Sequence, residues 1–374
     1  MTVEVKAVTK AGDLRRFIYL PERLYEKGYP QWVHPIYASE RDFFNPRKNP
    51  SWGYCEGRLY LARVDRRVVG RIMGIVNHRY NNEKGVRQAR FGFFDCTRHQ
   101  AVACALLETC EEWAKARGCS AIVGPMGFID LDSEGMLVEG FEHRATITTW
   151  WHPSWTHKLV EEAGYSKELD WVTYLVDFTK PLPEVYTRIA QRIIGRNGFK
   201  LVEFKRRREF APYVKPIFDL INDSYSGLDG VSYLDDDQIT RIAADYIPLL
   251  DPRFVKVITF GDRLAGFALG IPDMTEGIRA ARGRLFPFGI FKIMNAGRKT
   301  DQLDMLLGAI SDEFRGMGLD VLMANALYES ALKAGITMVD SHHELETNTR
   351  VRAEMERVGG RIYKRHRLFR KSLD

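Results

Sequence analysis

An internal repetition constrains the fold of this chain more than any other feature of its sequence. Three pairs of segments recur in the same order in the two halves: residues 65–75 and 261–271, residues 116–123 and 333–339, and residues 160–165 and 355–360. The first pair shows two short apolar strands around a tight polar turn, which predicts a β-hairpin. The second pair shows a helix that ends on a glycine and runs into a buried strand. Three correspondences in one order indicate a duplicated domain.

The length of 374 residues agrees with two domains, because one ordinary hydrophobic core rarely serves so long a chain. Strand character is lost near residues 181–183, so we place the domains at residues 1–180 and 181–374. Each half contains a helix with one apolar stripe that would pack on a sheet. The stripes consist of Val102, Leu106, Cys110, Trp113 and Ala114 in the first half and of Leu319, Leu322, Met323, Ala326, Leu327 and Ala331 in the second. The predicted fold class is α+β, with a mixed sheet flanked by helices in each of two tandem domains.

Composition and charge exclude several other classes of protein. A hydrophobic content of 45% with 28% charged residues is typical of a globular chain. No apolar run is long enough to cross a bilayer and the first residues do not form a signal peptide, so we expect a cytoplasmic protein. Five cysteines without metal-ligand spacing indicate reduced thiols and no metal site. The net charge of +6 comes from clusters that are typical of solvated faces, so no nucleic-acid partner is expected.

A glycine turn in the second half predicts an anion site. An apolar strand at residues 303–310 is followed by the turn Arg-Gly-Met-Gly-Leu-Asp at residues 315–320, which opens a helix. Such a turn directs several backbone N–H groups at one point, and the helix dipole adds positive potential there. A pyrophosphate group would suit this point, with Arg315 holding a phosphate. The sequence therefore predicts a phosphate-bearing cofactor and an enzyme.

The turn, the preceding hairpin and Asn348 together resemble the GCN5-related N-acetyltransferase (GNAT) superfamily, in a tandem arrangement over most of the chain. Arg315, Gly318 and Asp320 stand at the marked positions of the superfamily loop Gln/Arg-x-x-Gly-x-Gly/Ala, and Gly359 matches a later motif. The resemblance implies acyl-CoA or acetyl-CoA as co-substrate, without a metal. The residues that it places at the coenzyme are Gly308, Ala309, Ile310, Arg315, Gly316, Met317, Gly318 and Asn348.

A closer resemblance is to a bacterial subgroup of tandem members that includes bacterial ceramide synthases. Residues 345–348 and 359–367 stand in the places of its C-terminal motifs, and residues 17–50 are similar to its N-terminal region. This resemblance implies transfer of a long acyl chain from a thioester to a sphingoid amine in lipid metabolism. The acyl length, the acceptor and the oligomeric state are left open.

The chain departs from the superfamily pattern at three places. Asp320 replaces a small residue, and its carboxylate would repel phosphate unless it turns outward or caps the helix. Met355 stands where many members have a tyrosine that protonates the leaving thiolate. The N-terminal half carries residues 95–101, without glycine, in place of the loop. We therefore expect that half to bind no coenzyme and to shape the substrate channel.

Acyl transfer to an amine needs a base, and polar residues gather after the second strand of the C-terminal half. Our candidate catalytic residues are His343, His342 and Glu346, with Asp304 on the first strand. An imidazole suits the role because its unperturbed pKa is about 6.5. Asp340 and Glu344 in the same segment are further candidates for the base. The structural alternatives are a hydrogen-bonded histidine at a sheet end and a helix cap for Glu346.

Two further segments suggest the acceptor and the partners. Residues 150–155, with Trp171 and Tyr174, would line an apolar pocket or pack as an aromatic core. The insertion at residues 274–300 mixes apolar and basic residues, which suits a lid, an interfacial segment in peripheral contact with a membrane, or a packed loop. The expected substrate is a small-molecule or lipid amine. Two alternatives stay open: a Fem-like aminoacyl-tRNA-dependent transferase, and a catalytically inactive coenzyme or lipid sensor.

Overall fold

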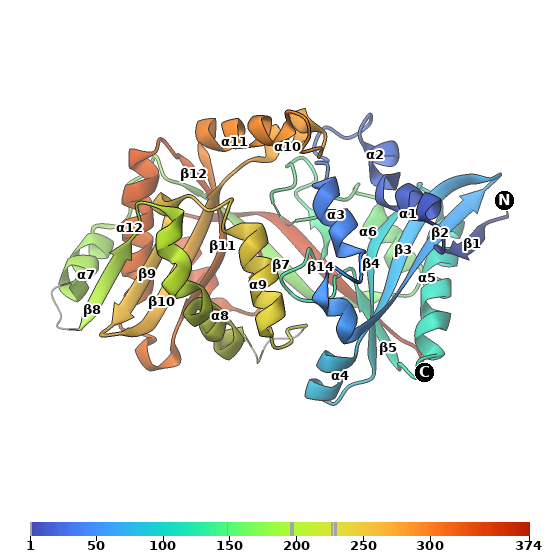
Figure 1. Ribbon diagram of the computed structural model, residues 1–374, viewed down its shortest axis with the longest axis horizontal. Coiled ribbons are helices and arrows are strands. Elements are labelled where there is room, and N and C mark those ends of the chain that lie inside the picture. The colour runs from blue at the N-terminus through green and yellow to red at the C-terminus, as the bar shows by residue number, and fades with distance from the viewer. Residues whose placement is uncertain (1, 148, 195–197, 226, 228–229) are drawn as a thin grey trace. The chain divides into compact units, whose positions relative to one another are not determined.

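The computed structural model describes residues 2–147, 149–194, 198–225, 227 and 230–374 (Figure 1). The chain forms two compact units. Unit 1 comprises Met1–Val172, Thr275–Asn295 and Tyr363–Asp374, and unit 2 comprises Thr173–Met274 and Ala296–Ile362. Most of the insertion predicted at residues 274–300 therefore packs in unit 1, although its sequence neighbours belong to unit 2.

Unit 1 is a sheet in the order β1-β2-β3-β4-β5-β14, with helices on its faces. Its strands are β1 (Glu4–Ala7), β2 (Cys55–Val64), β3 (Arg67–Asn77), β4 (Gln88–Cys96), β5 (Ala121–Gly124), β6 (Met136–Glu139) and most of β14 (Arg361–Ser372). Its helices are α1 (Ala11–Ile18), α2 (Leu20–Tyr25), α3 (Tyr37–Phe43), α4 (His78–Lys84), α5 (Gln100–Lys115), α6 (Thr156–Glu162), α10 (Thr275–Ala281) and most of α11 (Gly289–Lys299). The predicted stripe of α5 is buried in the core of this unit, from Val102 to Ala114.

Unit 2 is a sheet in the order β7-β12-β11-β10-β9-β8. Its strands are the later part of β7 (Ser166–Asp177), β8 (Phe199–Glu203), β9 (Val255–Phe260), β10 (Arg263–Pro272), β11 (Gln302–Ile310), β12 (Met338–Asp340) and β13 (Glu344–Leu345). Its helices are α7 (Glu184–Ile194), α8 (Ala211–Tyr225), α9 (Asp236–Tyr246), α12 (Leu319–Lys333) and α13 (Thr349–Arg357). The predicted stripe of α12 packs in the core of this unit, from Leu319 to Ala331.

The predicted repetition is present as repeated secondary structure. The first pair of segments forms the hairpins β2–β3 and β9–β10, which turn at residues 65–66 and 261–262. The second pair joins α5 to β5 and α12 to β12, and the third joins α6 to β7 and α13 to β14. In each of these four junctions a glycine with positive φ ends the helix: Gly118, Gly335, Gly164 and Gly359. Mixed sheets with flanking helices confirm the predicted α+β class.

The last strand of each repeat pairs with a strand of the other repeat. The end of β7 pairs with β12, with Val176 opposite Val339. Strand β14 pairs with β5, with Phe369 opposite Gly124. The placement of the two domains at residues 1–180 and 181–374 stays a prediction.

Helix length bears on contact with a membrane. Across the described ranges, no helix combines the length and the apolar character that a membrane span requires.

Candidate active site

The candidate site of unit 2 begins where two parallel strands stop pairing. Strands β11 and β12 pair over only three positions, of which the last is Asp304 opposite Asp340. Strand β11 continues to Ile310, and in the part of the chain that the structure describes it makes no later pair with β12. Residues 305–307 are half-buried and Gly308 is exposed. The carbonyl oxygen of Gly308 accepts from the hydroxyl of Tyr225 at 3.0 Å, and an extended ligand could pair with the other main-chain groups on this edge of β11.

The glycine turn lies at the far end of the same strand. Gly316 and Gly318 have φ values of 78° and 85°, and Gly318 is the N-cap residue of α12. A Cβ atom on Gly318 would lie 2.9 Å from Cδ1 of Ile193 and 3.0 Å from Cγ2 of Ile189, so α7 packs closely over this position. Among the residues that the structure describes, no side chain caps α12, so the N–H groups of its first turn can bind an anion.

Two charged residues modify this anion site. The guanidinium of Arg315 lies 2.7 Å from the carboxylate of Asp312 and donates to the carbonyl oxygen of Ile310 at 3.3 Å. Both partners of this ion pair are exposed, so the pair is weak and Arg315 can turn to a phosphate. Asp320 is half-buried in the first turn of α12 and does not cap the helix. Its carboxylate therefore opposes the attraction of the helix terminus for phosphate.

An irregular turn follows β12 and holds the two candidate histidines. The φ of His342 is 59°, a value that few non-glycine residues adopt. Its N–H donates to Oδ1 of Asp340 at 2.6 Å, and Oγ of Ser341 accepts from the N–H of Tyr174 at 2.9 Å. The rings of His342 and His343 stack with centroids 4.9 Å apart. Strained backbone that is fixed by several hydrogen bonds is typical of functional sites.

Carboxylates lie on both sides of this turn. Asp304 and Asp340 are fully buried, and Nε2 of Gln302 donates to Oδ1 of Asp304 at 2.7 Å. Glu344 begins β13, and desolvation raises its pKa to about 8. A carboxyl group with this pKa exchanges a proton near neutral pH, as a general base must. The sequence places Glu344 in the group of candidate bases, but the rise in its pKa depends on packing that the sequence does not show.

The residues after this turn have structural contacts of their own. Asn348 is the N-cap of α13, and its side-chain oxygen accepts from the N–H of Val351 at 3.3 Å. Its amide group can still donate to a coenzyme, and its place there stays a prediction. Glu346 is not the cap, and its main-chain oxygen accepts from Nη1 of Arg352 at 2.8 Å.

A tyrosine hydroxyl lies beside the position of Met355. Nε of Arg352 donates to the hydroxyl of Tyr174 at 3.1 Å, and this hydroxyl lies 3.0 Å from Oε1 of Glu356. Its two partners therefore come three residues before and one residue after Met355. We grouped Tyr174 with the aromatic residues 150–155 from the sequence, but it belongs to unit 2 and they belong to unit 1. Its contacts with α13 were missed because they are long-range.

The corresponding opening in unit 1 is filled by protein. Strands β4 and β5 also pair over three positions, ending with Arg90 opposite Val123. The chain then folds back, so that the N–H of Met126 donates to the carbonyl of Phe91 at 2.9 Å. A Cβ atom on Gly92 would lie only 2.5 Å from the carbonyl oxygen of Met126. This packing favours the expectation that the N-terminal half binds no coenzyme.

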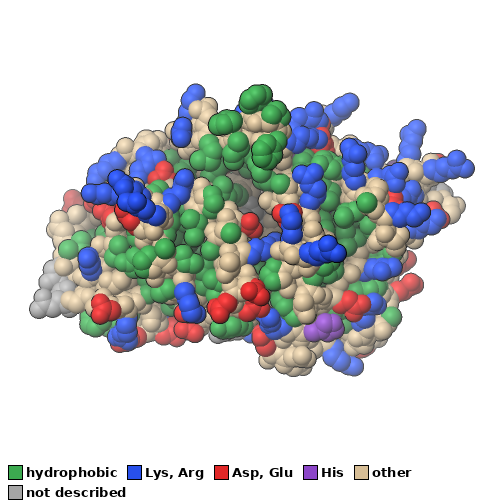
Figure 2. Space-filling model, in the orientation of Figure 1, with side chains coloured by type: hydrophobic (Ala, Val, Ile, Leu, Met, Phe, Trp, Pro, Cys, Tyr) green, Lys and Arg blue, Asp and Glu red, His purple; other side chains and the backbone are tan. Residues whose placement is uncertain are grey.

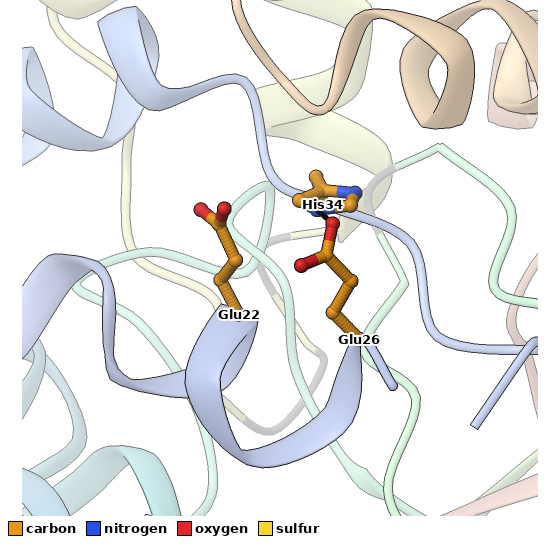
Figure 3. A group of neighbouring side chains, drawn as sticks. All are labelled: Glu22, Glu26 and His34. Carbon is orange, nitrogen blue, oxygen red and sulfur yellow. Dashed lines mark ion pairs between the residues drawn. The ribbon is translucent and has the colours of Figure 1, made fainter. Parts of the chain in front are cut away.

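A charged cluster in unit 1 has spacing that could suit a cation. Figure 3 shows Glu22, Glu26 and His34, whose possible ligand atoms all lie within 4.8 Å of one another. The carboxylates are already engaged, because Arg282 lies 2.9 Å from Glu22 and 2.6 Å from Glu26, and Arg284 lies 3.1 Å from Glu22. These guanidinium groups supply the positive charge that a metal would bring. The expectation of no metal site stays a prediction.

Comparison with known proteins identifies the fold. A chain that twice repeats a hairpin, a parallel strand pair and a crossover helix has the tandem GNAT fold. The solved structure of a tandem GNAT protein from the clavulanic acid biosynthesis pathway matches with a TM-score of 0.56 and 14% identity, covering 100% of this chain and 99% of that one. The predicted resemblance to tandem GNAT proteins is confirmed.

Relatives are also found by sequence. The chain is 28% identical to bacterial ceramide synthase of Caulobacter vibrioides (strain NA1000 / CB15N), over 99% of this chain and 98% of the relative. It is 23% identical to protein YghO of Escherichia coli (strain K12), over 99% and 95%. No protein-family model matches the chain. The fold and the ceramide synthase relative together support the predicted enzyme class, acyltransferase.

Proposed function

We propose that the protein is an acyl-CoA-dependent N-acyltransferase with its active site in unit 2. The observation that carries this proposal is the early end of pairing between β11 and β12, followed by the uncapped glycine turn before α12. The free edge of β11 suits the extended arm of a thioester, and the turn suits its pyrophosphate. The ceramide synthase relative supports a long acyl chain and a sphingoid amine as the acceptor.

The coenzyme residues follow from this placement. Gly308, Ala309 and Ile310 present main-chain groups to the thioester arm, and residues 316–318 present theirs to the pyrophosphate. Arg315 turns from Asp312 to a phosphate oxygen when the coenzyme arrives. Asn348 donates through its amide group.

The reaction forms a C–N bond and breaks the C–S bond of the thioester. The amine attacks as the neutral base, and the N–H groups near Gly308 stabilise the negative charge on the carbonyl oxygen. The amine proton passes to Glu344, directly or by way of His342 and His343, because the pKa of Glu344 is raised to about 8 by desolvation. The leaving thiolate takes a proton from the hydroxyl of Tyr174. Asp304 and Glu346 remain candidates for the base.

A binding assay combined with a turnover assay tests this proposal. Coenzyme A should raise the melting temperature, because a ligand that binds only the folded state stabilises it. Arg315→Glu should abolish that shift. Arg241→Glu is the matched control, since Arg241 pairs with Asp245 on α9, outside the glycine turn. An unchanged shift in Arg315→Glu would contradict the placement of the phosphates.

Release of free thiol from acyl-CoA then separates the alternatives. We expect release with long-chain acyl-CoA and a sphingoid amine, and we test shorter chains and other amines in parallel. Binding of coenzyme A without release across that panel would favour the inactive sensor, which Asp320 and Met355 suggest. Stabilisation by aminoacyl-tRNA and none by coenzyme A would favour the Fem-like transferase.

A further inference from the structure

The segment between α10 and α11 exposes aromatic side chains to an unusual degree. Phe286 is 86% exposed, and Phe288 and Phe291 are each 69% exposed. Among the residues that the structure describes, these are the three most exposed of the large hydrophobic side chains. Figure 2 shows hydrophobic side chains gathered over α10 and α11. Contiguous exposed apolar residues of this kind mark an interaction surface.

The segment that carries these aromatic residues contains basic side chains and no acidic ones. Residues 277–300 contain no acidic residue and six basic ones: Arg279, Arg282, Arg284, Lys292, Arg298 and Lys299. Arg282 pairs with Glu22 and Glu26, and Arg284 pairs with Glu22. Lys292 lies on α11 directly after Phe291, and its Nζ donates to the carbonyl oxygen of Ala280 at 3.1 Å.

The segment is held firmly at its base. The N–H of Tyr37 donates to the carbonyl of Gly283 at 3.1 Å. A Cβ atom on Gly283 would lie 2.1 Å from the carbonyl oxygen of Pro35, so the two backbones touch. Ile278 of α10 and Ile293 of α11 are buried. The aromatic side chains therefore project from an anchored platform.

We propose that residues 285–292 form a docking surface for an anionic lipid bilayer. Phe286, Phe288 and Phe291 enter the interface between head groups and acyl chains, and the basic side chains contact lipid phosphates. Charge decides between possible occupants. A second copy of the chain would bring the same acid-free basic segment against itself, whereas an anionic leaflet complements that segment. Docking requires no particular reaction, so it stands apart from the proposed acyl transfer.

Vesicle flotation of the full chain tests the proposal. Vesicles of phosphatidylcholine alone are compared with vesicles that also contain phosphatidylglycerol. We expect binding to the anionic vesicles that weakens with salt, and a loss of about tenfold or more in the triple variant Phe286→Ser, Phe288→Ser, Phe291→Ser. Because these side chains are exposed, the melting temperature of the triple variant should match that of the wild type.

The control removes comparable apolar surface elsewhere. Ile194 and Tyr233 are 58% and 59% exposed, and the double variant Ile194→Ser, Tyr233→Ser should bind vesicles like the wild type. Equal binding by the triple variant, or no binding of the wild type at low salt, would overturn the proposal. Sedimentation of the wild type as a dimer that the triple variant loses, without vesicle binding, would assign the surface to a second copy instead.

Discussion

Replacing Glu344 by glutamine should move activity and stability in opposite directions. Desolvation raises the pKa of this carboxyl group from an ordinary value of 4.5 to about 8. Between these two values the folded state holds a proton that the unfolded state has released, so stability falls as the pH rises through this window. At pH 7 this difference lowers the free energy of unfolding by at most about 3 kcal/mol. Glutamine has the same shape without the charge and should recover that free energy.

The same change should remove the base. Loss of a positioned general base typically lowers kcat by about 10²- to 10⁴-fold. In the wild type, kcat/KM should rise with pH up to about 8, where Glu344 becomes ionised. Glu344→Gln should lose this dependence, apart from the ionisation of the amine substrate itself.

Urea unfolding at several pH values and thiol release on the same samples measure both effects. Burial also raises the pKa of Glu40 and of Asp130 in unit 1 to about 7, so both proteins lose stability over a similar range. The informative quantity is therefore the difference in free energy of unfolding between variant and wild type, which should be near zero below about pH 4 and should reach its largest value above about pH 8. Glu313→Gln is the control, because Glu313 forms an exposed ion pair with Arg263. A variant that keeps its activity within about threefold would refute the role of Glu344 as base.

Three further changes test the rest of the site. Gly318→Ala should lower the free energy of unfolding by about 1–2 kcal/mol because its φ is positive, and its close contact with α7 should add to that loss. Gly316→Ala has the positive φ without such a contact and should show the first loss alone, as urea unfolding of both variants would measure. Asp320→Asn should tighten coenzyme A binding by roughly threefold at low salt in calorimetry, since one opposing charge is removed, and weaker binding would show that Asp320 faces elsewhere. Tyr174→Phe should lower kcat by about 10²-fold with KM unchanged, whereas a loss of melting temperature alone would indicate a purely structural hydroxyl.

The features that the sequence predicted correctly are local or repeated. The hairpin turns, the helix-ending glycines and the apolar stripes depend on neighbouring residues, and each occurs twice. Gly316 and Gly318 could be recognised because positive φ favours glycine.

The features that sequence reasoning missed depend on side-chain contacts, burial and strand pairing, which residue types alone do not specify. The sequence does not show that the guanidinium of Arg315 pairs with the carboxylate of Asp312, even though Asp312 stands only three positions earlier in the chain. The backbone of His342 is bent because Asp340 and Ser341 hold it, and the raised pKa of Glu344 follows from burial. The pairing of β7 with β12 and of β14 with β5 could not be predicted from the sequence either, because the paired strands lie far apart in the chain.

The pairing of β14 with β5 has a consequence for the order of events during synthesis. The neighbour of β5 in the finished sheet is β14, which the ribosome makes only after the whole of unit 2. Until then the half that emerges first keeps a bare strand edge, and bare edges recruit other chains. The sheet that contains β5 therefore cannot be completed until β14, near the end of the chain, has been synthesised. We expect chaperones that shield strand edges to be needed most during that interval.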